Sequence, residues 1–144
     1  MEIKYSINDF SKENHLENGI NYYVLNKEFI LFNKLYEEQL FYIYVKNEYI
    51  LTKYINKLNE YINWLGSNCK EYVINCYDKM IENNNGYGGL EWYTTFYCIS
   101  ININLEENGE IYTSIDGNDF PGNSWMYNEM KFKEKELVLI RVCL

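Results

Sequence analysis

The fold is decided by the alternating segments Ile99-Ser-Ile-Asn-Ile-Asn-Leu105 and Ile111-Tyr-Thr-Ser-Ile115, which a turn at Glu107-Asn108-Gly109 joins. Successive side chains of a strand point to opposite faces, so this alternation predicts two strands that each have one buried face. Asn-Gly between two such segments is a strong signal of a hairpin turn. We therefore predict an antiparallel hairpin whose core-facing side consists of Ile99, Ile101, Ile103, Leu105, Ile111 and Ile115.

A helix is predicted upstream of this hairpin, starting at Glu48. Apolar residues then recur at steps of four and three: Leu51, Ile55, Leu58, Ile62 and Leu65. This spacing places all of them on one face of a helix, with polar residues toward solvent. Gly66 fits the left-handed position that commonly ends a helix, so the helix is expected to stop there.

A second helix is predicted directly after the first. Asn68 followed by Glu71 resembles a capping box, which marks a helix start, and the segment from Asn83 to Gly86 is a stop signal. The apolar stripe of this helix consists of Cys69, Val73, Cys76 and Met80. Seven helical residues span about 10 Å, so Cys69 and Cys76 are too far apart to form a disulfide. The four cysteines also lack the paired spacing of a zinc site and are expected to be reduced core residues.

Strands are predicted on both sides of the helices. A short strand is expected from Ile3 to Ile7, where apolar and polar residues alternate. Aromatic and β-branched residues favour three more strands: Ile20 to Leu25, Phe29 to Tyr36, and Leu40 to Val45. The middle run also fits a helical stripe, so a helix remains the alternative there. A loop is expected from Asp116 to Trp125, and Leu137 to Val142 is the last predicted strand.

The order of these elements, strands then two helices then strands, favours the α+β class. We predict an antiparallel β-sheet packed on one face by two consecutive α-helices, in a single domain spanning residues 1–144. A chain of this length buries roughly two thirds of its unfolded surface and forms a core of its own. No segment resembles a signal peptide or approaches the roughly 20 apolar residues of a membrane span, so we expect a cytoplasmic protein.

Charge is distributed unevenly along the chain. Residues 81–130 contain eight acidic side chains and no Lys or Arg, whereas the remaining 13 acidic residues are matched by 13 basic ones. The formal charge of -8 therefore belongs to one third of the sequence. A negative surface neither releases counterions from nucleic acid nor docks on anionic lipid, so neither nucleic acid nor a membrane is the expected partner. A basic protein is electrostatically compatible.

The sequence contains no complete motif for catalysis, metal binding or nucleotide binding. His15 is the only histidine and lies in a polar segment, so we interpret it as a solvated residue. Gly86-Tyr-Gly-Gly89 lacks the lysine of a phosphate loop. An EF-hand loop starting at Asp116 would need calcium ligands or glycine at three positions that provide neither: Phe120, Pro121 and Tyr127. Pairs of acidic residues, as in a glycosidase, occur by chance in so acidic a stretch. We predict no enzyme, no cofactor and no metal site.

Candidates for partner binding therefore come from residues 81–130. Aromatic residues anchor protein interfaces, and acidic residues around them select and steer a basic partner. The alternative is that codon bias explains much of the tyrosine content of 16 residues, and that the acidic residues only keep the protein in solution. The predicted partner-binding residues are Trp92, Glu106, Glu110, Tyr112, Asp116, Asp119, Phe120, Trp125 and Tyr127.

One pattern in the C-terminal half resembles a known class of proteins. It comprises Ile99-Ser-Ile-Asn-Ile-Asn-Leu105, Glu110-Ile-Tyr-Thr-Ser-Ile-Asp116 and Asp119-Phe-Pro-Gly-Asn-Ser-Trp125. Over about residues 40–130, the chain resembles small bacterial immunity proteins of polymorphic toxin and contact-dependent growth inhibition systems. The resemblance implies two helices before a β-hairpin and an acidic loop with an aromatic residue after it. It also implies a function by binding, in which a cognate toxin domain is neutralised and no catalytic residue is carried over.

Two other functions remain as alternatives. A small-molecule or carbohydrate-binding module would use Trp92, Trp125 and nearby tyrosines as stacking platforms in a concave pocket. An enzyme would need polar groups with perturbed pKa values that converge in a cleft. Neither a monomer nor a dimer is favoured by the sequence.

Overall fold

The computed structural model describes residues 2–13, 21–81, 96–118 and 127–143, with the backbone alone for 21, 77–81, 127, 142 and 143. Within these ranges the chain forms a 3-10 helix, nine strands and three α-helices. The elements are η1 (Ile7–Asp9), β1 (Phe10–Glu13), β2 (Asn21–Leu25), β3 (Phe29–Leu31), β4 (Lys34–Tyr36), β5 (Phe41–Val45), α1 (Glu48–Lys53), α2 (Ile55–Ser67), α3 (Cys69–Ile81), β6 (Tyr97–Leu105), β7 (Ile111–Asn118), β8 (Tyr127–Lys133) and β9 (Glu136–Cys143).

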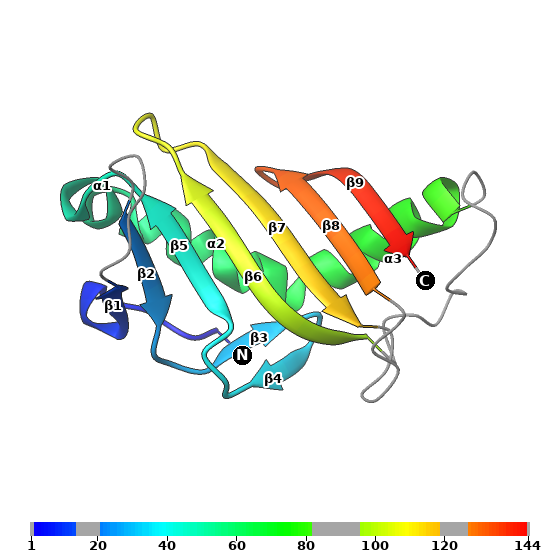
Figure 1. The fold of residues 1–144 in the computed structure, drawn as a ribbon, viewed down its shortest axis with the longest axis horizontal. Helices are drawn as coiled ribbons and strands as arrows, with labels where there is room; N and C mark the ends of the chain where they lie inside the picture. The colour runs from blue at the N-terminus through cyan, green and yellow to red at the C-terminus, as the bar shows by residue number, and fades with distance from the viewer. Residues whose placement is uncertain (1, 14–20, 82–95, 119–126, 144) are drawn as a thin grey trace.

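Seven strands form one sheet in the order β1-β2-β5-β6-β7-β8-β9, and β3 and β4 form a separate hairpin. Neighbouring strands in the large sheet are antiparallel except β5 and β6, which are parallel. Parallel strands need a long crossover connection, and here the helices lie in that connection. The predicted mixture of helices with a mostly antiparallel sheet is confirmed, but purely antiparallel pairing is wrong at the β5–β6 junction. Figure 1 shows α2 and α3 behind the strands of the large sheet.

The helix predicted from Glu48 is two helices, because α1 ends before Tyr54 and α2 starts after it. Asn47 caps α1, and its side-chain oxygen accepts a hydrogen bond from the Ile50 backbone N–H at 3.0 Å. The next helix, α3, begins at Cys69 as expected. Four residues of the predicted apolar stripe are buried: Leu51, Leu58, Ile62 and Leu65.

Gly66 has a different role from the predicted one. It lies within α2 and its φ is not positive, so the left-handed helix end is wrong. A Cβ atom at Gly66 would lie 2.7 Å from the Ile30 carbonyl oxygen, so glycine lets α2 contact β3 closely. Two backbone hydrogen bonds hold the hairpin on the helix: the Phe32 N–H donates to the Leu65 oxygen (3.2 Å), and the Asn33 N–H donates to the Gly66 oxygen (2.7 Å).

The ambiguous run from Phe29 to Tyr36 is a strand pair and not a helix. Its turn residues, Phe32 and Asn33, have φ values of 50° and 63°, and a two-residue turn with both φ values positive is of the type I′ kind that joins tight hairpins. The Phe29 ring stacks on Tyr36 and meets Phe41 of β5 edge-on, with centroid distances of 5.3 and 5.4 Å. These ring contacts bring the hairpin into the core.

The predicted β6–β7 hairpin is confirmed. Leu105 pairs with Ile111 at its closed end, and the chain turns at Gly109, where φ is +87°. A Cβ atom at Gly109 would lie 2.5 Å from the Tyr54 ring, so this turn needs glycine both for its backbone conformation and for space.

One residue of the hairpin points the other way from the prediction. A register shift between Cys98 and Ser100 inserts Ile99 as a bulge, which interrupts the alternation. Cys98 is fully buried in the core, and Ile99 is 42% exposed. The predicted core position of Ile99 is therefore wrong, because alternation along a sequence does not reveal an inserted residue.

The C-terminal part contains a strand that the sequence pattern did not predict. β7 continues to Asn118, so Asp116 lies in a strand and not in the expected loop. β8 then pairs with both β7 and β9. Its buried apolar residues, Met130 and Phe132, alternate with charged ones over too short a stretch to stand out. The last predicted strand is confirmed as β9.

The strand predicted from Ile3 to Ile7 is wrong. The backbone of Ile3 and Tyr5 forms hydrogen bonds with the side-chain amides of Asn63 and Asn59 on α2, so this segment lies against a helix and not in a sheet. The first strand of the sheet, β1, begins only after η1.

The core lies against the face of the sheet that carries Phe41, Ile43, Ile101, Ile103, Ile115 and Met130. Tyr61 of α2 forms a buried hydrogen bond with Thr113 of β7 (2.7 Å). The hydroxyl of Tyr72 on α3 accepts a hydrogen bond from the Leu137 N–H of β9 (2.9 Å). None of the helices in the described ranges combines the length and the apolar composition that crossing a membrane requires.

Candidate functional site

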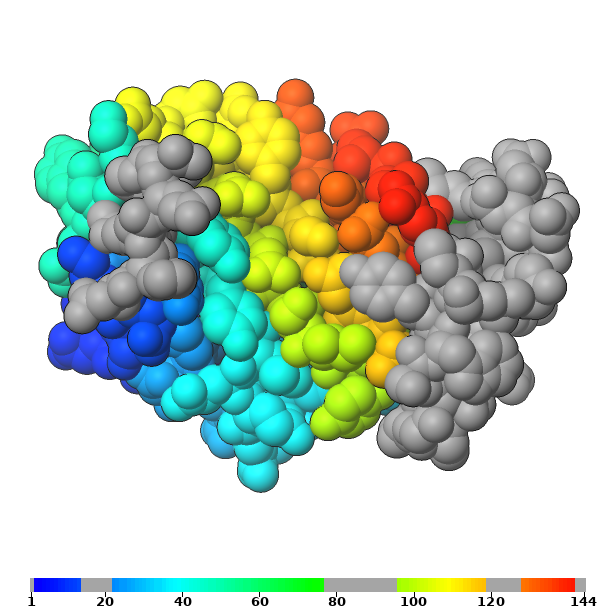
Figure 2. Space-filling model, in the orientation of Figure 1, coloured from blue at the N-terminus to red at the C-terminus, as the bar shows by residue number. Residues whose placement is uncertain are grey.

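The candidate site is the face of the seven-stranded sheet that points away from this core. Along β5 and β7, every second residue is buried and the residues between them are half-buried. Figure 2 shows this face, with side chains of β5, β6, β7 and β8 side by side across its middle. We call it the tyrosine face and define it by Tyr22, Tyr42, Tyr44, Ser100, Asn102, Tyr112 and Asp116.

Strand register decides which side chains meet across the tyrosine face, because directly paired residues point to the same side of a sheet. One row across the sheet consists of Tyr22, Tyr44, Asn104, Tyr112 and Lys133. A second consists of Tyr42, Asn102, Ser114 and Lys131. A third consists of Ser100, Asp116, Glu129 and Arg141. The face is therefore aromatic on β2 and β5 and carries amides and a hydroxyl on β6. It combines tyrosine, serine and aspartate on β7 and is charged on β8 and β9.

Three tyrosines form the aromatic end of this face. The Tyr22 ring lies 6.3 Å from Tyr42 and 5.7 Å from Tyr44, between ring centroids. These distances are within the range of favourable aromatic pairs. Burial, followed by the neighbouring Tyr22 and Tyr42, raises the pKa of Tyr44, so its hydroxyl remains a hydrogen-bond donor at neutral pH.

A chain of hydrogen bonds leads from the tyrosines to a carboxylate. The Tyr44 hydroxyl donates to Asn102 Oδ1 (3.3 Å), and Asn102 Nδ2 donates to Ser100 Oγ (3.3 Å). The Ser100 hydroxyl in turn donates to Asp116 Oδ2 (3.4 Å). All three bonds run in one direction, toward the negative charge. The chain thus orders four half-buried side chains from three strands.

A second polar pair lies at the start of β7, close to the hairpin turn. The Tyr112 hydroxyl donates to Glu110 Oε2 at 2.7 Å. This bond to the charged form of the carboxylate lowers the pKa of Glu110, and the same bond raises the pKa of Tyr112. Glu110 is therefore an anion, and Tyr112 a neutral ring held next to it, at neutral pH.

Basic residues from outside the acidic stretch lie beside it on this face. Lys133 is paired with Tyr112, and Arg141 with Glu129, because β8 and β9 continue the sheet beyond β7. At the other side of the β6–β7 turn, Lys46 forms an ion pair with Glu107 at 2.6 Å. The acidic third of the sequence is thus interleaved with positive charges in the described part of this surface.

Four of the predicted partner-binding residues have described side chains. Tyr112 and Asp116 lie on the outward side of β7, Glu110 directly precedes this strand and contacts Tyr112, and the exposed Glu106 directly follows β6. Tyr127 pairs with Asn118 at the start of β8, but its side chain is outside the described residues. The other predicted positions also lie outside the described ranges: Trp92, Asp119, Phe120 and Trp125. His15 and the glycine-rich segment 86–89 lie outside them as well.

Sequence reasoning missed the aromatic end of the face. The pattern of aromatic and β-branched residues predicts a strand from Leu40 to Val45 but does not say which side chains point outward. In the structure, burial alternates strictly along Phe41-Tyr-Ile-Tyr-Val45. Tyr42 and Tyr44 share the side opposite Phe41, Ile43 and Val45. The alternation of tyrosine with aliphatic residues was the signal that could have placed these rings on an outward face.

Thiols and metal-binding side chains are the other groups among the described residues that could take part in chemistry. The three cysteines with described side chains, Cys69, Cys76 and Cys98, are free thiols, and burial raises the pKa of Cys98 to about 12, which disfavours the nucleophilic thiolate. Within the described ranges, no cluster of three or more His, Cys, Asp or Glu side chains could hold a metal ion. Hydroxyl, amide and carboxylate groups beside aromatic rings suit contact with a protein surface.

No family model, no curated protein and no solved structure matches the chain.

Proposed function

We propose that the protein is an immunity protein that binds and neutralises a cognate toxin domain in the cytosol of a bacterium. The observation that carries this proposal is the tyrosine face, in which half-buried rings adjoin an ordered array of polar groups. The resemblance of residues 40–130 to immunity proteins supplies the kind of partner. No catalytic group of this chain is needed, because inhibition by binding takes only a complementary surface.

The tyrosine face has the chemical make-up of an interface centre. Tyrosine is enriched at binding hot spots, since it supplies a large apolar ring and a hydroxyl at a small entropic cost. The Tyr22 ring contacts both Tyr42 and Tyr44, so three rings lie next to one another. The hydrogen-bonded chain from Tyr44 to Asp116 holds the neighbouring polar groups in place before a partner arrives, which reduces the ordering cost of binding.

The proposal divides the two faces of the sheet between stability and binding. Two consecutive helices, α2 and α3, pack on the core face, and the opposite face is left to the partner. The contacts from Tyr61 to Thr113 and from Tyr72 to Leu137 support this arrangement. The position of both helices behind the strands in Figure 1 agrees with it.

The expected partner surface is basic, with aromatic or aliphatic groups at its centre. Glu106 and Glu110 lie at the exposed end of the β6–β7 hairpin, where they would steer a positive surface during approach. Asp116 lies deeper in the face and would accept a hydrogen bond from an Arg or Lys of the toxin. Lys131, Lys133 and Arg141 lie on the other flank and would select the orientation in which the toxin docks.

The decisive experiment uses the toxin domain encoded next to the gene for this protein. Co-expression should rescue growth of a bacterium that produces the toxin, and the two proteins should co-purify as a complex. If the cells die and no complex forms, the immunity function is refuted.

Single substitutions then test the surface. Tyr44→Ala should weaken the complex about 30-fold, because truncating an aromatic anchor typically costs about 2 kcal/mol. Glu106→Lys should lower the association rate about tenfold at low salt, with a smaller effect at high salt. Glu71→Lys, an equal charge change at an exposed position of α3, is the matched control and should leave both constants unchanged. Equal effects of Glu106→Lys and Glu71→Lys would place the interface elsewhere.

A further inference from the structure

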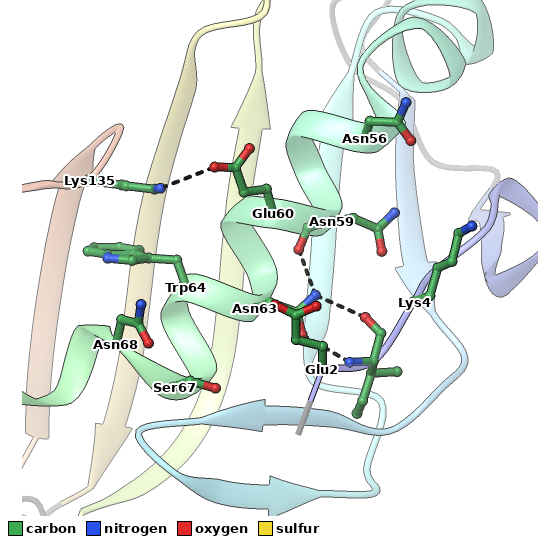
Figure 3. Close-up of a pocket in the computed structure, with 11 residues that line it drawn as sticks. Glu2, Lys4, Asn56, Asn59, Glu60, Asn63, Trp64, Ser67, Asn68 and Lys135 are labelled. Atoms are coloured by element: carbon green, nitrogen blue, oxygen red, sulfur yellow. Dashed lines mark hydrogen bonds and ion pairs between the residues drawn. The ribbon is translucent and has the colours of Figure 1, made fainter.

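The helix side of the molecule carries a concave surface, distinct from the tyrosine face. It is a groove of about 500 Å³ along the outer side of α2, a volume within the range of small-molecule sites. Figure 3 shows Asn56, Glu60 and Asn63 projecting from the helix between two walls. We call this surface the α2 groove. The N-terminal segment with Glu2 and Lys4 forms one wall, and Trp64 with Lys135 forms the other.

The N-terminal wall is fixed by an asparagine clamp. Asn59 accepts from the Tyr5 N–H (2.6 Å) and donates to the Tyr5 carbonyl (2.7 Å). Asn63 makes the same pair of bonds with Ile3, at 3.0 and 2.9 Å. Residues four apart on a helix and two apart on an extended chain have similar spacing, so the two amides bind alternate peptide units. Both amides are thus occupied by the wall and position it.

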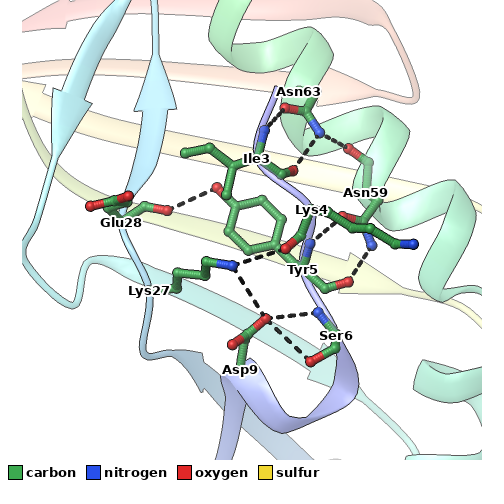
Figure 4. Close-up of polar contacts among 9 residues, drawn as sticks. All are labelled: Ile3, Lys4, Tyr5, Ser6, Asp9, Lys27, Glu28, Asn59 and Asn63. Atoms are coloured by element: carbon green, nitrogen blue, oxygen red, sulfur yellow. Dashed lines mark hydrogen bonds and ion pairs between the residues drawn. The ribbon is translucent and has the colours of Figure 1, made fainter. Parts of the chain in front are cut away.

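Further contacts anchor this wall from behind, as Figure 4 shows. The Tyr5 ring is 2% exposed, and its hydroxyl donates to the Glu28 carbonyl (2.9 Å). Lys27 Nζ donates to the Lys4 carbonyl (3.0 Å) and lies 4.0 Å from Asp9 Oδ2. The groove is therefore a preformed feature of the fold, and a ligand would not have to order its wall.

The opposite wall presents an aromatic ring held in one orientation. Trp64 meets Phe132 edge-on, with 6.0 Å between ring centroids, and lies 6.2 Å from Tyr72. Lys135 Nζ is 5.8 Å from the Trp64 ring centroid and 3.8 Å from Glu60 Oε1. The half-buried Trp64 ring thus combines a fixed apolar surface with a charged pair at its rim.

The polar groups of the α2 groove select a class of ligand. Two acidic and two basic side chains line it, so their charges cancel and an anion such as a phosphate gains no net attraction. Asn56, Ser67 and Asn68 make no side-chain hydrogen bond to another described residue, and their groups both donate and accept. Hydroxyl groups of a sugar also donate and accept, and the apolar face of a sugar ring can cover an indole.

We infer that the α2 groove binds a short neutral saccharide, with Trp64 as the apolar platform and Asn56, Glu60, Ser67 and Asn68 as its hydrogen-bonding partners. This site is independent of the proposed toxin-binding surface, since it lies on α2 and the tyrosine face lies on the sheet. The protein would thus have a ligand site in addition to its protein-binding face.

The test uses cellobiose, maltose and N,N′-diacetylchitobiose as probes, each added at millimolar concentration to the full-length protein labelled with ¹⁵N. At least one probe should produce saturable chemical-shift changes at the Trp64 indole N–H and the Asn56 and Asn68 amides. Glucose 6-phosphate should bind no more tightly than the neutral probes. If none of the three disaccharides perturbs these signals, or if the changes fall on the tyrosine face, the inference is wrong.

Variants distinguish a specific site from surface association. Asn56→Ala and Ser67→Ala each remove one exposed hydrogen-bonding group and should weaken binding of the active probe about fivefold. Asn104→Ala on the exposed side of β6 is the matched control and should bind like the unaltered protein. Loss of binding in Asn104→Ala, or unchanged binding in both groove variants, would overturn the assignment.

Discussion

The two faces of the large sheet are built by the same strands but differ in burial and in hydrogen bonding. On the core face, Ile101, Ile103 and Ile115 are fully buried, and the polar Thr113 is paired with Tyr61. On the tyrosine face, the residues between them, such as Asn102, are half-buried and form hydrogen bonds with neighbouring side chains of the same face. Burial of apolar area stabilises the fold, whereas hydrogen bonds that exchange with water contribute little net stability. The comparison teaches that one strand can supply the stability of the fold from one side and present ordered polar groups on the other.

The sharpest test compares neighbouring residues of β6. Ile103→Ala should lower the free energy of unfolding by about 2 to 5 kcal/mol, because it leaves a cavity in a fully buried site. Asn102→Ala should change it by less than about 1 kcal/mol, since Asn102 is half-buried and water can replace its partners. Urea unfolding followed by circular dichroism measures both. Similar losses in the two variants would mean that the tyrosine face also stabilises the fold.

The second test concerns the contact between α2 and the β3–β4 hairpin. Gly66→Ala should cost about 1 to 3 kcal/mol, because the added Cβ would lie 2.7 Å from the Ile30 carbonyl oxygen and would push α2 away from β3. Ser67→Ala changes the adjacent exposed residue and should be within about 0.5 kcal/mol of the unaltered protein. Thermal unfolding of the pair measures the difference. A neutral Gly66→Ala would show that the contact between helix and hairpin yields easily.

The third test concerns a hydroxyl group on each face. Tyr61→Phe should cost about 1 to 3 kcal/mol, because Thr113 is 3% exposed and loses its 2.7 Å partner. Tyr44→Phe should cost less than about 1 kcal/mol, since the Asn102 oxygen that it releases is half-buried. The Tyr61 hydroxyl also donates to the Glu134 carbonyl (3.0 Å), so the double variant Tyr61→Phe/Thr113→Val should recover only the part of the loss that comes from Thr113. Additive losses in that double variant would contradict a direct coupling of the two hydroxyls.

The last test is a dependence of stability on alkaline pH, which is absent at neutral pH and reports on buried groups of the core. Burial raises the pKa of Tyr36 from 10.0 and the pKa of Cys98 from 9.0, each to about 12. The unfolded chain therefore loses these protons at lower pH than the folded protein does. Their stabilising contribution is complete below pH 9 and is lost as the pH rises toward 12, at about 1.4 kcal/mol per pH unit for each group.

Urea midpoints measured at successive pH values test this linkage. Tyr36→Phe should reduce the slope between the ordinary tyrosine pKa of 10.0 and a pH of about 12, although it can lower stability at neutral pH. A midpoint that stays constant over this range would show that neither group keeps its proton on folding.

The sequence predicted the elements whose signal is local. The apolar stripe from Leu51 to Leu65 and the alternation around Asn108-Gly109 each specify a helix or a hairpin within a few residues. The sequence named Glu110, Tyr112 and Asp116 as candidates, but only the structure shows that Asp116 belongs to the same strand as Tyr112, because the sequence predicts a loop from Asp116 onward. Ile99 could not be placed, since a bulge depends on how a neighbouring strand pairs.

By itself, the sequence determined the helical stripes, the β6–β7 hairpin and the acidic character of residues 81–130, because each follows from composition or short-range periodicity. Only the tertiary structure decided that β5 pairs in parallel with β6, which brings Tyr42 and Tyr44 beside Asn102. It also decided that basic residues of β8 and β9 interleave with the acidic ones. These arrangements depend on strand pairing between distant segments, which is fixed by the packing of the whole core and not by any one stretch of the chain.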